Sequence, residues 1–293
     1  MQAPYVLAIG ESLIDAVSTT FVTNLSEAQE LVLKPGGSPA NLCRFLHSLG
    51  TAAKIVAALG DDGLAKIILE DMSAKGIDAT TVQQVADQPT TIILVGKSTG
   101  TPDFIPYRGA DQYIGKIDVG LLAGSSIVHT TAFALSKQPA QTNILEALEK
   151  AHAMGRAVSV DWNYADKIWG KGNNAKAVFS RLMKMKPLLK FSLDDAERFF
   201  GRPLDAESAK GLLSEYAPSL CCLTCGAAGV WYREGSGNWV HQQAKPVEVK
   251  DSTGAGDSFW AGFLHAYLGK STMQESILNA LDTAALRLQG KLS

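Results

Sequence analysis

A carboxylate follows three small residues at the start of a strongly apolar segment late in the chain. The stretch reads DSTGAGDSFWAGFLHAYL, residues 251–268, in which Gly254, Ala255 and Gly256 precede Asp257. In a helix that begins near Ala255, the first-turn amides lack intrahelical acceptors and can bind an anion. A lone aspartate there is also simply stabilised by the helix dipole. Together, however, anion-binding amides and a proton-accepting carboxylate are the two parts that phosphoryl transfer to an alcohol needs.

A second glycine-rich helix start lies early in the chain, in PGGSPANLCRFLHSLG, residues 35–50. Gly36 and Gly37 predict a tight turn, and Ser38 is expected to cap the following helix, with Pro39 in its first turn. Asn41 falls in the same turn, where its carboxamide can both donate and accept hydrogen bonds. A glycine turn before a capped helix is common, so this stretch indicates a binding site only in combination with the stretch at residues 251–268.

The segments between these stretches alternate short apolar runs with helical periodicity. This alternation predicts βαβ units and a mostly parallel sheet. The expected strands are YVLAIG, AKIVAALG, SIVHTTA, AVSVDW, LLKFS and LCCLTCG. The expected helices are 42–49, 64–74, 142–154, 175–185 and 194–200, with Gly50, Gly76 and Gly155 at helix ends.

Two segments break the alternation, at residues 11–36 and 88–112. Both have strand patterns without an intervening helix, so they are expected to pair as a small separate sheet that forms a lid. No linker or internal repeat divides the rest. We therefore predict a single domain over residues 1–293, with the lid contributed by these two segments.

Composition restricts the partners of the chain. Apolar residues make up 46% and charged residues 19% of 293 residues, which is typical of a globular protein. The net charge of −2 and the absence of a basic run argue against nucleic acid, and no apolar stretch is long enough to span a membrane. The start, MQAPYVLAIGESLID, lacks the basic region of a signal peptide. We expect a cytoplasmic protein with reduced cysteines and a small-molecule partner.

The two glycine-rich stretches, GGSPANLCRFLHSLG and DSTGAGDSFWAGFL, resemble the two signatures of the ribokinase-like (PfkB-type) sugar kinases. They occur in the family's order and at its separation, and the similarity covers essentially the whole chain. The resemblance implies a ribokinase-like α/β/α sandwich with a small β-sheet lid, an ATP site in the C-terminal half and a sugar site under the lid. Two copies could pair through their lids, although no sequence pattern requires it.

The resemblance also implies roles for individual residues. Asp257 would be the general base, with the amides of Gly254, Ala255 and Gly256 as the anion hole for the transferred phosphoryl group. ATP would lie beside the turn residue Thr253 and the LTCGAAGVWY stretch, at Thr224 and Gly226, and Mg²⁺ would bridge its phosphates. The residues expected to hold the sugar are Asp15, Gly36, Gly37, Asn41, Asn163 and Asp257.

Two places depart from the family's pattern. The family's Asn-x-x-Glu element corresponds to Ser192 and Asp195, so Ser192 would face the nucleotide and Asp195 would support the metal; alternatively, Ser192 only caps a helix. The D-x-N-x-R element corresponds to DWNYA, where Ala165 stands at the arginine position. An acidic sugar is disfavoured as substrate, because alanine cannot form the paired hydrogen bonds by which an arginine binds a substrate carboxylate. Arg108 could reach the substrate from the lid or lie on the surface of a strand.

Three other functions have weaker support in the sequence. A GDS-type esterase would use Ser258, but its motif belongs on the first strand, and no histidine here has an aspartate three residues before it. A P-loop kinase would need GxxxxGK[ST], which is absent. A non-catalytic sugar or nucleotide sensor fits the departures but not the intact Asp257. We therefore expect an ATP-dependent kinase of a primary sugar hydroxyl, most like a fructokinase; 2-keto-3-deoxygluconate kinase and ribokinase are the alternatives.

Overall fold

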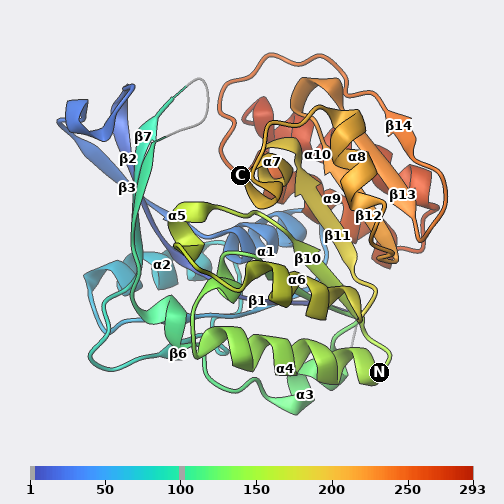
Figure 1. Ribbon diagram of the computed structural model, residues 1–293. Helices are drawn as coiled ribbons and strands as arrows, with labels where there is room; N and C mark the ends of the chain where they lie inside the picture. The colour runs from blue at the N-terminus through green and yellow to red at the C-terminus, as the bar shows by residue number, and fades with distance from the viewer. Residues whose placement is uncertain (1–3, 99–102, 293) are drawn as a thin grey trace.

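The computed structural model describes residues 4–98 and 103–292, and its centre is an eight-stranded, mostly parallel sheet (Figure 1). The strand order is β14-β13-β12-β11-β10-β9-β1-β4, with antiparallel pairing only at the β12–β13 and β13–β14 edges. The strands are β1 (Val6–Ile9), β4 (Ala53–Val56), β9 (Ile127–Thr131), β10 (Ala157–Asp161), β11 (Leu188–Ser192), β12 (Leu220–Thr224), β13 (Val230–Glu234) and β14 (Val240–Gln242). Because neighbouring strands run parallel, their carboxyl ends meet at one edge, where ligands bind in such sheets.

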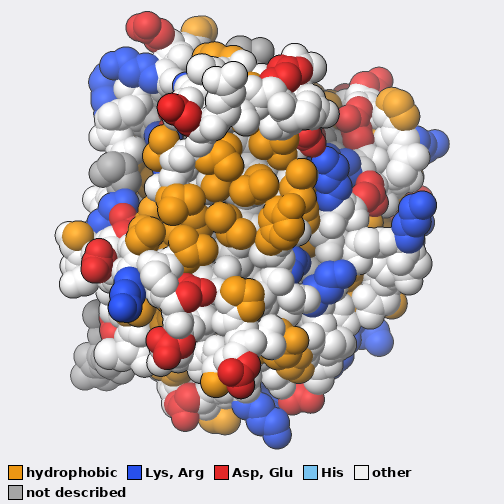
Figure 2. Space-filling view, turned by 90° about the vertical axis from the view of Figure 1, so that its left-hand side faces the viewer, with side chains coloured by type: hydrophobic (Ala, Val, Ile, Leu, Met, Phe, Trp, Pro, Cys, Tyr) orange, Lys and Arg blue, Asp and Glu red, His pale blue; other side chains and the backbone are white. Residues whose placement is uncertain are grey.

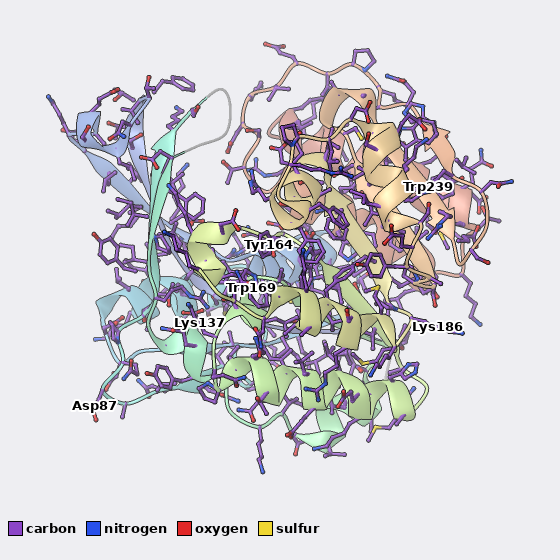
Figure 3. All side chains as sticks on the ribbon, viewed as in Figure 1. Asp87, Lys137, Tyr164, Trp169, Lys186 and Trp239 are labelled. Carbon is purple, nitrogen blue, oxygen red and sulfur yellow. The ribbon has the colours of Figure 1, made fainter. Side chains whose placement is uncertain are left out.

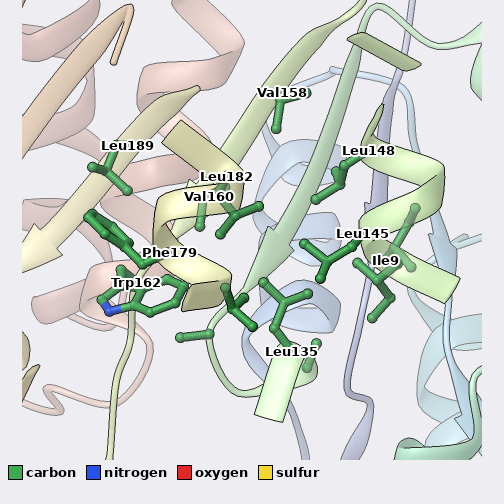
Figure 4. Packing of buried hydrophobic residues seen from close by; sticks show 14 of the residues in the cluster. Ile9, Leu135, Leu145, Leu148, Val158, Val160, Trp162, Phe179, Leu182 and Leu189 are labelled. Carbon is green, nitrogen blue, oxygen red and sulfur yellow. The ribbon is translucent and has the colours of Figure 1, made fainter. Parts of the chain in front are cut away.

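Helices cover both faces of this sheet and create two apolar cores. Figure 1 shows α4 and α6 in front of the sheet and α1 behind it. On the α4 and α6 side, Val160, Trp162, Phe179 and Leu182 are buried together (Figure 4). The helices are α1 (Ser38–Ser48), α2 (Gly63–Ala74), α3 (Val119–Gly124), α4 (Ala140–Ala153), α5 (Asp166–Trp169), α6 (Ala175–Met183), α7 (Leu193–Phe200), α8 (Ala206–Leu213), α9 (Ala255–Leu268) and α10 (Met273–Leu288). The predicted α/β/α sandwich is confirmed.

A separate four-stranded sheet projects from one side of the sandwich (Figure 1). Its order is β3-β2-β7-β8, formed by β2 (Leu13–Phe21), β3 (Leu31–Gly36), β7 (Ile92–Lys97) and β8 (Phe104–Tyr107). The two segments that lack helical periodicity pair directly, from Ile14 opposite Ile92 to Val17 opposite Val95. The small separate sheet is therefore present as predicted, although residues 99–102 of the second segment lie outside the described residues.

One predicted strand and one predicted cap differ from the structure. AKIVAALG divides into β4 in the large sheet and β5 (Ala58–Leu59), which pairs with β6 (Gln83–Gln84) in a short two-stranded sheet. Helix α1 begins at Ser38 itself, and Gly37 precedes it without a side-chain cap, so the predicted capping role of Ser38 is wrong. Gly50, Gly76 and Gly155 all have positive φ at helix ends, as predicted.

The four cysteines are free thiols, three of them buried in the cores. Within residues 4–98 and 103–292, no group of three or more His, Cys, Asp or Glu side chains is arranged to hold a metal ion. The helices of the described chain are all too short or too polar to cross a bilayer.

Candidate active site

The GAGD turn begins α9 at the carboxyl edge of the large sheet. Gly254 precedes the helix with φ +73°, a left-handed conformation that favours glycine. The Ala255 amide donates to the Ser252 carbonyl at 3.2 Å, so it is engaged within the turn. Over the part of the chain that the structure describes, the amides of Gly254 and Gly256 donate to no protein acceptor. These two amides, at the positive end of a 14-residue helix, can bind an anion.

Asp257 connects the two glycine-rich helix starts, which are far apart in the sequence. The Ser38 hydroxyl donates to its Oδ1 at 2.6 Å, and the Asn41 carboxamide donates to its Oδ2 at 2.8 Å. Ser38 is the first residue of α1 rather than its cap, and its hydroxyl donates to this carboxylate. Asp257 is half-buried in the first turn of α9. Asn41 is thus in direct contact with Asp257, the residue that the sequence predicts to be the general base.

The orientation of Asn41 is fixed by a buried arginine one helical turn later. Arg44 donates from Nη1 to the Asn41 carboxamide oxygen at 2.6 Å and from Nε to Asp71 at 2.9 Å. Because the Asn41 oxygen accepts from Arg44, its NH₂ group is the part that faces Asp257. Arg44 was not identified from the sequence, although a charged residue on the buried face of a predicted helix was a usable signal.

Asp15 enters the site from the small sheet and lies against the turn before α1. A Cβ added to Gly36 would lie 2.0 Å from Asp15 Oδ2, and one on Gly37 would lie 2.4 Å from the Glu11 carbonyl oxygen. Both glycines are therefore required by close packing, and Gly37 also has φ +96°. Burial, and then the charge of Asp257, raise the pKa of Asp15 to about 6.

Glu11 is a buried acid beside the same turn that was not identified from the sequence. It accepts from the Thr131 hydroxyl at 2.8 Å and from the Ser38 amide at 3.3 Å. Burial is the main reason that its pKa rises to about 8. The feature of the sequence that could have identified Glu11 is its position two residues after the buried strand β1, at the carboxyl edge of the sheet.

The residues predicted to face the nucleotide lie at the ends of β11 and β12. Ser192 and Thr224 are directly opposite in register, and Thr224 donates to the Phe191 carbonyl at 3.3 Å. Gly226 is exposed in the turn beyond β12, with φ +55°. Thr253 is exposed in the turn before α9, where its amide donates to Asp251 at 2.9 Å. Thr253 directly precedes the GAGD turn, and Ser192, Thr224 and Gly226 lie at or just beyond the carboxyl ends of β11 and β12.

Ser192 and Asp195 form a reciprocal capping box at the start of α7. The Asp195 amide donates to Ser192 Oγ at 3.0 Å, and the Ser192 amide donates to Asp195 Oδ2 at 3.1 Å. The other oxygen, Oδ1, accepts from Arg198 at 3.2 Å. The capping alternative for Ser192 is therefore present in the structure. With both oxygens engaged by protein donors, Asp195 fits a magnesium ion bound mainly by phosphates and water rather than directly by the chain.

Arg108 follows β8 and is not a surface residue, because its side chain is only 8% exposed. It forms a salt bridge with Asp111, donates to the Ser136 hydroxyl at 2.9 Å and stacks over the Phe133 ring at 4.1 Å. The Asn163 carboxamide oxygen accepts from the Phe133 amide at 3.2 Å. Arg108 and Asn163 therefore both contact the loop after β9 at Phe133.

Ala165 immediately precedes the short helix α5, at the arginine position of the D-x-N-x-R pattern. On either side of it, Tyr164 and Trp169 are buried and pack with ring centroids 6.1 Å apart (Figure 3). The segment after β10 is thus held by aromatic packing. Alanine provides no guanidinium there for a substrate carboxylate.

A buried ion pair lies beneath the GAGD turn, between β10 and β11. Lys190 Nζ is 2.8 Å from both carboxylate oxygens of Asp161, its direct neighbour in the sheet register. Burial favours the neutral amine, but nearby carboxylates outweigh it and raise the pKa of Lys190. The carboxylates that do so are those of Asp161, Asp195 and Asp257. Sequence reasoning assigned no role to Lys190 or Asp161.

The esterase alternative has no support in this geometry. Ser258 is fully buried, and its hydroxyl donates to the Ala255 carbonyl at 2.9 Å within the first turn of α9. A nucleophilic serine must reach its substrate and a base. Ser258 instead stabilises the turn that presents Asp257.

Comparisons with known proteins agree on one family. The model of the pfkB family of carbohydrate kinases matches residues 3–292. An ATP-dependent 6-phosphofructokinase of Thermoanaerobacterium thermosaccharolyticum is 32% identical, over 97% of this chain and 88% of its own. A fructokinase of Klebsiella pneumoniae is 28% identical, over 78% and 76%. The structure of Halothermothrix orenii fructokinase superposes with a TM-score of 0.86 at 31% identity, covering 96% of this chain and 98% of that one. The chain therefore belongs to the pfkB family of carbohydrate kinases.

Proposed function

We propose that this ATP-dependent sugar kinase phosphorylates a primary hydroxyl of fructose. The observation that carries this proposal is the position of Asp257, which lies beside the free amides of Gly254 and Gly256 and contacts Asn41. A proton acceptor and an anion-binding turn are thus within one helical turn of each other. Similarity to proteins named fructokinase supports fructose as the acceptor.

In the proposed reaction, the sugar hydroxyl attacks the γ-phosphorus of ATP. The new oxygen–phosphorus bond forms as the bond to the bridging oxygen of ADP breaks, and the hydroxyl proton passes to Asp257. The amides of Gly254 and Gly256 stabilise the charge on the transferring group. Asp15 and Asn41 orient the sugar so that its hydroxyl lies beside Asp257, and Gly36 and Gly37 let it approach the backbone closely.

The nucleotide is proposed to lie along Ser192, Thr224, Gly226 and Thr253, where the ends of β11 and β12 meet the turn before α9. Mg²⁺, when bound, would neutralise charge on the phosphates. Asp195 would reach it through water, because both of its carboxylate oxygens already accept protein hydrogen bonds. Its proposed contribution is to position the metal's water ligands.

The acceptor is proposed to be a neutral sugar because Ala165 stands where the family's pattern has arginine. Fructose 6-phosphate is a second candidate, supported by the relative named 6-phosphofructokinase. Lys34 also supports it, because this exposed cation lies directly opposite Asp15 on the same face of the small sheet. The two candidates share the attack geometry at Asp257 and differ in whether the sugar carries a phosphate.

ADP release from Mg-ATP tests the function against fructose, fructose 6-phosphate, ribose and 2-keto-3-deoxygluconate. We expect turnover with fructose and a much lower kcat/KM with the acidic sugar. Preference for fructose 6-phosphate would assign the second candidate, and turnover with 2-keto-3-deoxygluconate would contradict the interpretation of Ala165. Binding of ATP and sugar without turnover would identify a non-catalytic sensor.

We further propose that the chain is a single kinase domain whose small sheet is a lid, and that two copies pair through their lids. One face of that sheet carries Asp15 and therefore faces the site, so the alternate residues face away. The outward row consists of Leu33, Ala16, Leu94 and Ile105, directly opposite one another across the four strands. Leu33 and Ile105 are 43% and 40% exposed, and Figure 2 shows a continuous apolar patch on this side of the molecule. Such patches mark protein interfaces.

Leu33→Glu combined with Ile105→Glu is expected to convert a dimer into a monomer, because two charges per copy would be buried in the pairing. Sedimentation velocity at micromolar protein measures this directly. The control is Val119→Glu, a similarly exposed apolar residue at the start of α3, which should stay dimeric. A monomeric wild type at these concentrations would disprove pairing through the lid.

A further inference from the structure

The position of Lys190 is unusual for a structural lysine. It lies on β11 within an apolar run, its side chain is only 5% exposed, and its ammonium faces the Asp161 carboxylate on the next strand. Replacing a buried ion pair by apolar residues of similar size often leaves stability unchanged or improves it. Stability alone therefore does not explain why a charge lies here, below the site.

The ammonium of Lys190 reaches the backbone of the GAGD turn. A Cβ added to Gly256 would lie 3.3 Å from Lys190 Nζ and 3.7 Å from its Cε. Glycine at 256 thus leaves room for the lysine, and the ammonium lies next to the residue whose amide has no protein acceptor. The cation and the free amide border the same small volume at the start of α9.

The hydrogen bonds of Lys190 leave one donor available. An ammonium has three N–H groups, and Asp161 accepts two of them at 2.8 Å each. Across the described residues, no acceptor is present for the third. The ammonium is charged, because the surrounding carboxylates outweigh the cost of its burial.

The carboxylates around Lys190 would repel a phosphate group if no cation lay beside them. Asp161, Asp195 and Asp257 all act on Lys190 electrostatically, so three carboxylates border the position that an anionic phosphoryl group must enter. In a site of low dielectric constant, their repulsion of that group would be strong. A fixed ammonium beside the amides would offset it at no cost of reorganisation.

We propose that Lys190 is a catalytic residue whose ammonium contacts the phosphoryl group at the Gly254–Gly256 turn during transfer, with Asp161 holding it in place. This inference rests on the proposed kinase function. The bonds that form and break are those given above: the sugar oxygen bonds to phosphorus, ADP leaves, and the proton goes to Asp257. Lys190 gains and loses no proton; it contributes positive charge and one N–H donor.

The test compares Asp161→Asn with the double variant Asp161→Asn/Lys190→Met. Lys190→Met alone would leave an uncompensated carboxylate in the core, and both variants avoid this. In Asp161→Asn the ammonium keeps an amide oxygen as acceptor and the nearby charges of Asp195 and Asp257, so the pair compares the site with and without the ammonium. We expect the double variant to have a kcat about 10²-fold below that of Asp161→Asn, the usual effect of one donor to a transition-state anion. The KM for the sugar should change little. Lys116→Met, at an exposed lysine outside the site, should match wild type.

Binding provides a second measurement that a structural role would not affect. In the presence of sugar, ADP with aluminium fluoride mimics the transferring group, and its affinity should fall about as much as kcat in the double variant. The affinity for ADP alone should be little changed. Equal kcat and equal fluoride-complex affinity in the two variants would overturn the assignment of Lys190. If the proposed kinase function is wrong, the wild-type protein will itself show no turnover in the same experiments.

Discussion

Asp257→Asn is expected to lower kcat about 10²- to 10⁴-fold, the usual contribution of a positioned general base. Asparagine keeps the shape of the side chain, and its oxygen can still accept from Ser38 or Asn41, so the contact between α1 and α9 should survive. What is lost is the ability to take the proton from the sugar hydroxyl. Steady-state kinetics with fructose and Mg-ATP measures the effect, and ATP affinity should be nearly unchanged.

Asp251→Asn is the matched control for this substitution. Asp251 begins the same turn, but its carboxylate pairs with Arg287 at 3.0 Å, whereas that of Asp257 accepts from Ser38 and Asn41. Losing a half-exposed ion pair should cost little. If Asp257→Asn and Asp251→Asn reduce kcat equally, the effect belongs to the turn and not to a base, and Asp257 loses its assigned role.

Local patterns predicted the elements that carry this site. The apolar face of residues 255–268 and the small residues before it placed the start of α9, and the break in helical periodicity identified the small sheet. Both features are properties of adjacent residues, so a single sequence displays them. The alternation of strands and helices also predicted the mostly parallel sheet, although not the order of its strands.

Long-range contacts account for what was missed or wrong. Ser38 was predicted to cap α1, but the helix begins one residue earlier than that role requires, and the Ser38 hydroxyl bonds Asp257, 219 residues later. Arg108 is held off the surface in part by the Ser136 hydroxyl, 28 residues later. Lys190 and Asp161 become neighbours only when β10 and β11 pair.

The residues that were not identified share one usable signal. Glu11 and Lys190 are charged residues within or directly after buried strands, where an unpaired charge is costly. A charge in such a run indicates either a partner or a ligand, although the sequence alone does not reveal which. In both cases the structure supplies hydroxyl, amide or carboxylate partners at the edge that holds the site.

Asp15→Asn is expected to raise the KM for the sugar about 10- to 100-fold, because a hydrogen bond to a charged group contributes about 1.5–3 kcal/mol. The effect on kcat should be smaller, since Asp15 orients the sugar and takes no proton in the proposed reaction. Gly36→Ala should act on the same carboxylate, because its added methyl carbon would lie 2.0 Å from Asp15 Oδ2. A sugar KM unchanged by both substitutions would place the sugar elsewhere.

The pH dependence distinguishes the Asp15 carboxylate from other acids of the site. Burial and the charge of Asp257 raise the pKa of Asp15 to about 6, so its charged form is lost in the free enzyme as the pH falls through that value. Because kcat/KM reports the ionisation of the free enzyme, it should decline below about pH 6 and level off above about pH 7. In Asp15→Asn this decline should disappear from the same range, because asparagine does not titrate. Persistence of the decline near pH 6 would assign it to another group, such as Asp161, whose pKa burial also raises to about 6. Glu11, with a pKa raised to about 8, would instead titrate at higher pH. A midpoint near 6 that is absent from the variant would therefore identify Asp15 as the acid that must be ionised to bind the sugar.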